Sequence, residues 1–78
     1  MVFNREKTAS NIRSKIYESN LSQSKIADML FVSPMAVHKW VTCATLPTLE
    51  ALADLCTILE CEPTEILVFD KDAADKSA

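Results

Sequence analysis

The stretch of sequence that decides the fold is LSQSKIADMLFVSPMAVHKW, residues 21–40. Ser22 is a typical N-cap residue, and it predicts a short helix that runs to about Leu30. Ser33-Pro34 predicts the start of a second helix, because serine caps well and proline lacks only an N–H that the first turn leaves unpaired. Two short helices joined by so tight a turn must cross steeply.

The residues of these two helices divide into inward and outward sets. Ala27 is small enough to lie at the crossing point, and Val37 and Trp40 are expected to fill the space between the helices. We interpret Trp40 as a core residue rather than a stacking platform. The second helix is expected to end near Val41. At 100° per residue, an arc of about 100° holds four residues that should face outward, namely Met35, His38, Lys39 and Thr42.

The flanking sequence predicts three more helices. Asn4 can cap a first helix over residues 5–19, and Asn20 can end it because asparagine tolerates the left-handed conformation. Thr48 can cap a fourth helix over residues 49–60, and Pro63 opens a fifth that reaches about residue 69. The fourth helix is expected to bury one stripe of side chains, namely Leu49, Leu52, Cys56 and Leu59.

These elements predict an all-α fold, a compact bundle of five short helices without strands. The helical domain is expected to span residues 1–69, and residues 70–78 to form a flexible acidic tail. The chain of 78 residues contains no glycine. This absence agrees with a helical fold, because hairpins and nucleotide-binding loops need backbone with positive φ.

Composition excludes several classes of protein. No apolar run exceeds four residues and the N-terminus lacks a signal-peptide layout, so we expect a cytoplasmic protein with no membrane partner. The sequence contains three cysteines, an odd number, and no CxxC motif; they are Cys43, Cys56 and Cys61. This pattern disfavours a disulfide framework, a metal site or a cofactor. No nucleophile, base and orienting group stand together around His38, so we expect neither an enzyme nor a small-molecule substrate.

Charge is distributed unevenly along the chain. The net charge is −3, which is unusual for a nucleic-acid binder. Residues 1–45, however, carry six basic and three acidic side chains, whereas residues 46–78 carry two basic and eight acidic ones. The molecule is therefore predicted to have a basic half, which includes both crossing helices, and an acidic half.

Several segments resemble the lambda-repressor-like, or Cro/repressor, helix-turn-helix family over about residues 12–67. The segments that carry the resemblance are Leu21-Ser22-Gln23, Ile26-Ala27, Val32-Ser33, Val37 with Trp40, Pro47-Thr48-Leu49-Glu50-Ala51-Leu52, and Glu65-Ile66-Leu67. In that family the third helix enters the major groove of DNA. The resemblance implies that Gln23 bonds a phosphate, and that the outward residues bind DNA or a partner together with Ser33 and Pro34 at the leading end of the third helix.

The sequence departs from the family pattern in ways that make this face apolar. Phe31 holds a turn position where the family usually has glycine, which costs about 1 kcal/mol if the backbone stays left-handed and exposes an aromatic ring. Pro34 and Met35 cannot donate hydrogen bonds to base edges. The loop over residues 41–45 carries no charge, and Ile16 and Val41 stand where the family often places an ion pair.

Taken whole, the sequence is similar to the small antirepressors of temperate lactococcal phages. The first hypothesis is therefore a regulator of a lysis–lysogeny switch that binds the N-terminal DNA-binding domain of a cognate phage repressor, with or without contact to operator DNA. The alternative is a Cro-like repressor that binds double-stranded operator DNA directly as a dimer. A third hypothesis is a toxin–antitoxin or scaffold component that uses the fold only for assembly.

Overall fold

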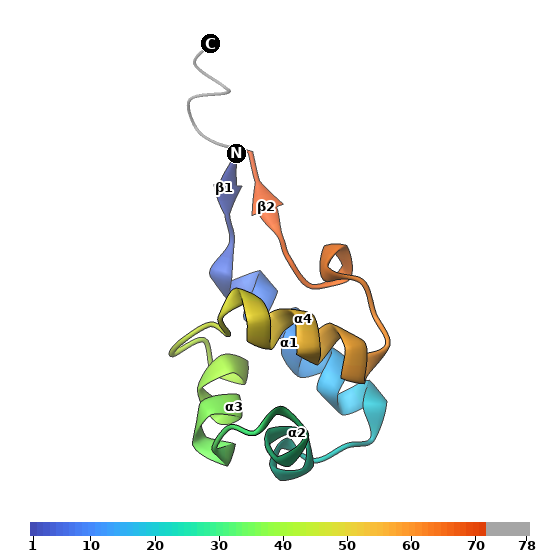
Figure 1. The fold of residues 1–78 in the computed structure, drawn as a ribbon. Coiled ribbons are helices and arrows are strands. Elements are labelled where there is room, and N and C mark those ends of the chain that lie inside the picture. The colour runs from blue at the N-terminus through green and yellow to red at the C-terminus, as the bar shows by residue number, and fades with distance from the viewer. Residues whose placement is uncertain (72–78) are drawn as a thin grey trace.

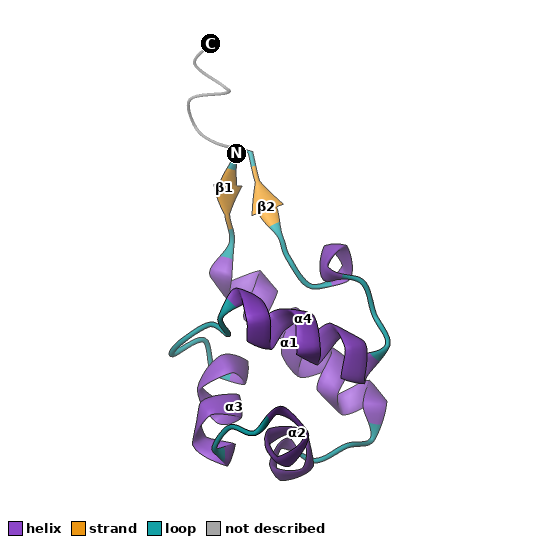
Figure 2. Ribbon diagram, viewed as in Figure 1, coloured by secondary structure: helices purple, strands orange, loops and turns teal. Residues whose placement is uncertain are grey.

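The computed structural model describes residues 1–71, in which four α-helices, one 3₁₀ helix and two short strands are present (Figure 1 and Figure 2). The elements in chain order are β1 (Val2–Phe3), α1 (Arg5–Ser19), α2 (Gln23–Leu30), α3 (Pro34–Val41), α4 (Leu49–Leu59), the 3₁₀ helix η1 (Pro63–Glu65) and β2 (Phe69–Asp70). No helix within this described part is long and apolar enough to cross a membrane.

Local capping sets the start of every α-helix, as the sequence predicts. Each cap side chain accepts a hydrogen bond from the backbone N–H three residues ahead, at 2.8–3.2 Å. The four cap residues are Asn4, Ser22, Ser33 and Thr48. The predicted left-handed end of α1 at Asn20 is also present, with φ 64°. These starts are local because each cap satisfies N–H groups of its own first turn.

The core lies where α1 and α4 cover the α2–α3 pair. Its fully buried side chains come from every helix, namely Ile12, Ile26, Val37, Leu55 and Ile66. Ala27 is also fully buried, and α2 and α3 share the most extensive contact in the molecule. Trp40 is only 6% exposed, which confirms its prediction as a core residue. The helix-turn-helix is thus held by apolar contacts on its inner side.

The predicted stripe on α4 is wrong at its first position. Leu49 is 84% exposed, whereas Leu55, which the predicted stripe does not include, is fully buried. The buried face follows the spacing i, i+3, i+4, i+7 over Leu52, Leu55, Cys56 and Leu59. Leu49 lies about 70° from the centre of this face and in the first turn of the helix, so it points past the edge of the core.

The prediction of five α-helices without strands is also wrong. The segment after Pro63 forms a single 3₁₀ turn, and the chain then extends into β2, which pairs antiparallel with β1. Val2 pairs with Asp70 and Phe3 with Phe69. The ring centroids of the two phenylalanines lie 5.5 Å apart. The lack of glycine disfavours a tight hairpin, but it does not prevent two segments far apart in sequence from pairing. The predicted flexible tail begins at residue 70, but Asp70 belongs to β2. Residues 72–78 of that tail lie outside the described part.

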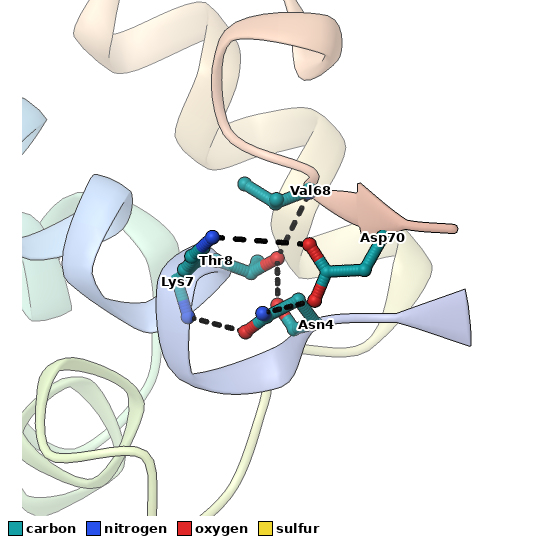
Figure 3. Close-up of polar contacts among 5 residues, drawn as sticks. All are labelled: Asn4, Lys7, Thr8, Val68 and Asp70. Atoms are coloured by element: carbon teal, nitrogen blue, oxygen red, sulfur yellow. Dashed lines mark hydrogen bonds and ion pairs between the residues drawn. The ribbon is translucent and has the colours of Figure 1, made fainter. Parts of the chain in front are cut away.

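A small polar network fastens the two strands to the start of α1 (Figure 3). The hydroxyl of Thr8 donates to the Asn4 carbonyl at 2.8 Å and accepts from the Val68 N–H at 3.1 Å, and the Asn4 N–H donates to the Val68 carbonyl at 2.7 Å. Asn4 Nδ2 also donates to Asp70 Oδ2 at 2.6 Å, and Lys7 Nζ lies 3.8 Å from Asp70 Oδ1. The strands therefore lie at the end of the molecule opposite α2 and α3 (Figure 1).

The buried position of Ala27 gives a direct test of how α2 and α3 cross. Ala27→Leu is expected to lower the free energy of unfolding by about 1–3 kcal/mol, because three extra carbons must enter a packed contact. Denaturant unfolding of the purified variant measures this loss, and Ala53→Leu on the exposed side of α4 is the matched control. Equal stability of the two leucine variants would contradict the crossing.

Candidate functional site

The leading end of α3 is set by Ser33 and Pro34. The Ser33 side chain accepts from the Ala36 N–H at 3.2 Å, and Pro34 takes the first helical position. Both residues are exposed, and they precede the outward face of α3. The Ser33 oxygen accepts one hydrogen bond from its own helix, so toward a ligand the hydroxyl keeps its O–H donor and one acceptor lone pair.

The outward face of α3 and its C-cap consists of the four residues that helical geometry predicts. Met35, His38, Lys39 and Thr42 are all exposed, whereas Val37, Trp40 and Val41 are buried. Met35 is the most prominent apolar member, with 59% of its surface exposed. The Thr42 hydroxyl donates back to the Lys39 carbonyl at 3.3 Å. Lys39 is therefore the only residue of α3 in this structure that carries a permanent charge.

Phe31 is the most exposed aromatic residue of the site. Its backbone is left-handed, with φ 59° and ψ 40°, and its side chain is 95% exposed. This backbone ends α2, because the Phe31 N–H donates to the Asp28 carbonyl at 3.3 Å and the Val32 N–H to the Ala27 carbonyl at 3.0 Å. A phenylalanine here gains nothing from burial and pays the steric cost of the left-handed region.

Replacing Phe31 with glycine is expected to raise the free energy of unfolding by about 1 kcal/mol, since glycine adopts positive φ without a steric cost. Phe31→Ala is the matched control, because alanine removes the same ring but keeps the Cβ that clashes. Thermal unfolding of both variants separates the backbone effect from the loss of the ring. A Phe31→Gly protein less stable than wild type would show that the ring contributes to folding.

Two arginines of α1 are directed at the end of α3. Arg13 Nη1 donates to the Val41 carbonyl at 3.2 Å, and Arg5 Nη2 donates to the Cys43 carbonyl at 3.4 Å. A cation is favourable there, since a helix carries partial negative charge at its C-terminus. Ile16 and Val41, expected to replace an ion pair, are both buried in the core cluster. Lys25 and Lys39 are thus the only cations of α2 and α3.

Gln23, the residue expected to bond a phosphate, is the first residue of α2 and is half-buried. It lies one helix length, about 12 Å, from Phe31 at the other end of α2. The structure therefore gathers Phe31, Pro34 and Met35 around the turn and holds Gln23 apart from them along the chain. Sequence reasoning missed Met29, which is 43% exposed near the end of α2.

No group of three or more His, Cys, Asp or Glu side chains in residues 1–71 is placed to hold a metal ion.

Two solved repressor structures are similar to this chain. The P22 c2 repressor, solved in complex with a synthetic operator, matches with 28% identity and a TM-score of 0.73, over 81% of this chain and 96% of its own. The SOS-response transcriptional repressor LexA from Eubacterium rectale matches with 23% identity and a TM-score of 0.76, over 94% of this chain and 79% of its own. The second likeness concerns the fold alone. No curated protein matches the sequence significantly.

The family assignment follows from the match to a family model, which extends well beyond the two crossing helices. Residues 11–72 match the Cro/C1-type HTH DNA-binding domain. That range includes the α2–α3 pair, its supporting helix α4 and most of α1, and the fold agrees with both repressor structures. The chain belongs to the family of Cro/C1-type helix-turn-helix DNA-binding domains.

Proposed function

We propose that this protein is an antirepressor of a phage lysis–lysogeny switch, which binds the DNA-binding domain of a cognate repressor. The proposed contact surface, here called the turn face, consists of Phe31, Pro34, Met35, His38, Lys39 and Thr42. The role is one of binding in the host cytoplasm, without a catalytic step. This proposed role is a specialised one within a family whose members regulate transcription as repressors.

The observation that carries the proposal is the 95% exposure of Phe31 in a left-handed conformation. An exposed aromatic ring at a strained position lowers stability, so its presence is best explained by a contact that it makes. Aromatic and methionine side chains are enriched at the centres of protein interfaces, where they supply most of the binding energy. Met35 beside it provides a second, adaptable anchor.

The charge of the turn face and its surroundings also favours a basic protein partner over DNA. The DNA-binding domain of a repressor presents a basic surface to phosphates. Asp28 on α2 is exposed next to the turn face and can pair with such a surface. Arg5 and Arg13 donate to backbone carbonyls, which lowers their availability to phosphates. The cations that remain give little attraction for a duplex.

The alternative function is that of a Cro-like repressor that binds operator DNA as a dimer. The family match and the likeness to the P22 c2 repressor, which was solved on an operator, favour it. In this case Gln23 would bond a phosphate at the start of α2, and Lys39 would contact DNA from the middle of α3. The two functions use the same face and differ in its ligand.

Binding of the purified protein to operator DNA and to the N-terminal domain of the neighbouring repressor, measured separately, distinguishes the two functions. We expect clear binding to the repressor domain and weak binding to duplex at ~150 mM salt. With Lys25, Lys39, Arg5 and Arg13 all counted as an upper limit, the slope of log K against log salt should be no steeper than about −4 per monomer, and about −2 if both arginines stay bonded to backbone carbonyls. Nanomolar sequence-specific binding to DNA by the isolated protein would favour the Cro-like function.

A further inference from the structure

The end of α4 brings two cysteines together. Glu60 is left-handed, with φ 53°, and its N–H donates to the Thr57 carbonyl at 3.3 Å. The Cys61 N–H donates to the Cys56 carbonyl at 3.0 Å. These two bonds define a Schellman motif, which places in contact the side chain three positions before the helix cap and the side chain after the left-handed residue. Here both of those side chains are thiols.

The two thiols differ in their accessibility. Cys56 is 5% exposed within the core, and Cys61 is half-buried and packs against it. Burial raises the pKa of Cys56 to about 11, and the neighbouring Cys61 thiol is the next largest cause. Both residues line one surface pocket of about 380 Å³. Cys61 is thus the more accessible of the two thiols to a reagent in the pocket.

The pocket has a marked negative charge. Glu60, Glu62 and Glu65 line it together with the two cysteines. Lys15 bonds Glu65 at 3.0 Å, and its pKa is raised chiefly by that bond, with Cys61 among the smaller causes. One ammonium group therefore faces both Glu65 and the Cys61 thiol, while two carboxylates are left without a cation partner among the ion pairs of the described residues. A negatively charged reagent would be repelled from this pocket.

We propose that Cys56 and Cys61 are a redox-modification site that forms an intramolecular disulfide by exchange with a cationic or uncharged small-molecule disulfide. A disulfide spans α-carbons about 4.4–6.8 Å apart. The backbone bond from the Cys61 N–H to the Cys56 carbonyl holds the two residues side by side, and their thiols are in hydrogen-bonding contact. The site is independent of the turn face, because the C-terminal end of α4 lies away from α3 (Figure 1).

The exchange takes place in two balanced steps. The Cys61 thiolate attacks one sulfur of the small disulfide, which releases one small thiolate and leaves a mixed disulfide on Cys61. Cys56 then gives its proton to solvent, and its thiolate attacks the Cys61 sulfur and releases the second small thiolate. The two protein thiols lose two electrons, and the small disulfide gains them and becomes two thiols.

Cystamine, a cationic disulfide, is the probe for the test, applied to the folded protein in native buffer. Cleavage after glutamate, which spares the Glu62–Pro63 bond because proline follows it, separates the three cysteines: Cys43 falls in fragment 19–50, Cys56 in 51–60 and Cys61 in 61–65. The expected result is a linked pair of fragments 51–60 and 61–65 that is two hydrogens lighter than their sum, with Cys43 open to alkylation. Oxidised glutathione, which is anionic, is expected to give the same product at least about tenfold more slowly at low salt.

Matched variants and a denatured control decide the outcome. Cys43→Ser should form the linked pair at the wild-type rate, and Cys61→Ser should form none. In denaturant the linked pair should form more slowly and with a larger share of links to Cys43, because the helix cap that aligns the thiols is lost and only the shorter loop between Cys56 and Cys61 still favours their pairing. A mixed disulfide that persists on Cys61 would overturn the proposal. So would disulfides that involve Cys43 in a yield equal to that of the Cys56–Cys61 disulfide in the folded protein.

Discussion

The Trp40→Ala variant is expected to lose about 3–5 kcal/mol of its free energy of unfolding, because it empties a large volume at the centre of the core. Trp40 is 6% exposed, and it lies on the inner side of α3. Domains of this size are stable by only about 4–12 kcal/mol in total. Denaturant unfolding followed by circular dichroism should therefore show that the variant is partly unfolded even before denaturant is added.

The exposed aromatic of the turn face provides the control for this prediction. Phe31→Ala removes a ring that is 95% exposed, and alanine keeps the Cβ that phenylalanine has at this left-handed position. The free energy of unfolding of this variant should therefore stay within about 0.5 kcal/mol of wild type. If Trp40→Ala were equally neutral, Trp40 would be available on the surface as a stacking group. The placement of α3 against the core would then be wrong.

The second large effect concerns binding to the repressor domain. Phe31→Ala and Met35→Ala are each expected to weaken that binding by about 1–3 kcal/mol, which is about 5- to 150-fold in Kd, because both remove apolar anchors from the centre of the contact. Lys39→Ala should matter less, since a lysine that faces a basic partner gains little. Toward operator DNA the order should reverse, because Lys39 is the cation on the outward face of α3. Calorimetry of the three variants against both ligands measures this difference.

Tyr17→Ala is the control for loss of an exposed aromatic ring outside the turn face. Tyr17 lies on α1 and is 84% exposed, so its removal should leave binding to the repressor domain unchanged. The antirepressor surface would be refuted by a Met35→Ala protein that binds the repressor as wild type does while Lys39→Ala abolishes binding. Equal losses for Tyr17→Ala and Phe31→Ala would indicate a non-specific hydrophobic contact.

The helix-turn-helix itself could be predicted because its determinants lie close together in sequence. Ser22, Ser33 and Pro34 fix the starts of two helices through bonds within one turn. The same holds for the faces of α3, since eight residues suffice to separate the exposed Met35 from the buried Trp40. The left-handed Phe31 agrees with the resemblance to the family, which usually places glycine at this turn position, and the structure keeps that conformation with phenylalanine.

The ligand of the turn face could not be settled by the same reasoning. Sequence and structure agree on which side chains face outward, but an outward side chain has no contact that would identify its ligand. The sequence also gave no sign that Arg5 and Arg13 reach the end of α3, 38 and 28 residues away. These two contacts change the number of cations available to a phosphate backbone, and only the packing of α1 against α3 creates them.

The sequence by itself determined the four α-helices, their caps and the tight turn, because each of these depends on hydrogen bonds and side-chain periodicity within a few residues. The tertiary structure decided what the two ends of the chain do. Asn4 and Asp70 bond across 66 residues, and Val68 reaches Thr8 across 60, so a non-helical segment that ends in β2 replaces the rest of the predicted fifth helix. The backbone there satisfies its polar groups against α1 and β1 instead of within a helix of its own, and which partner it meets depends on how the whole core closes.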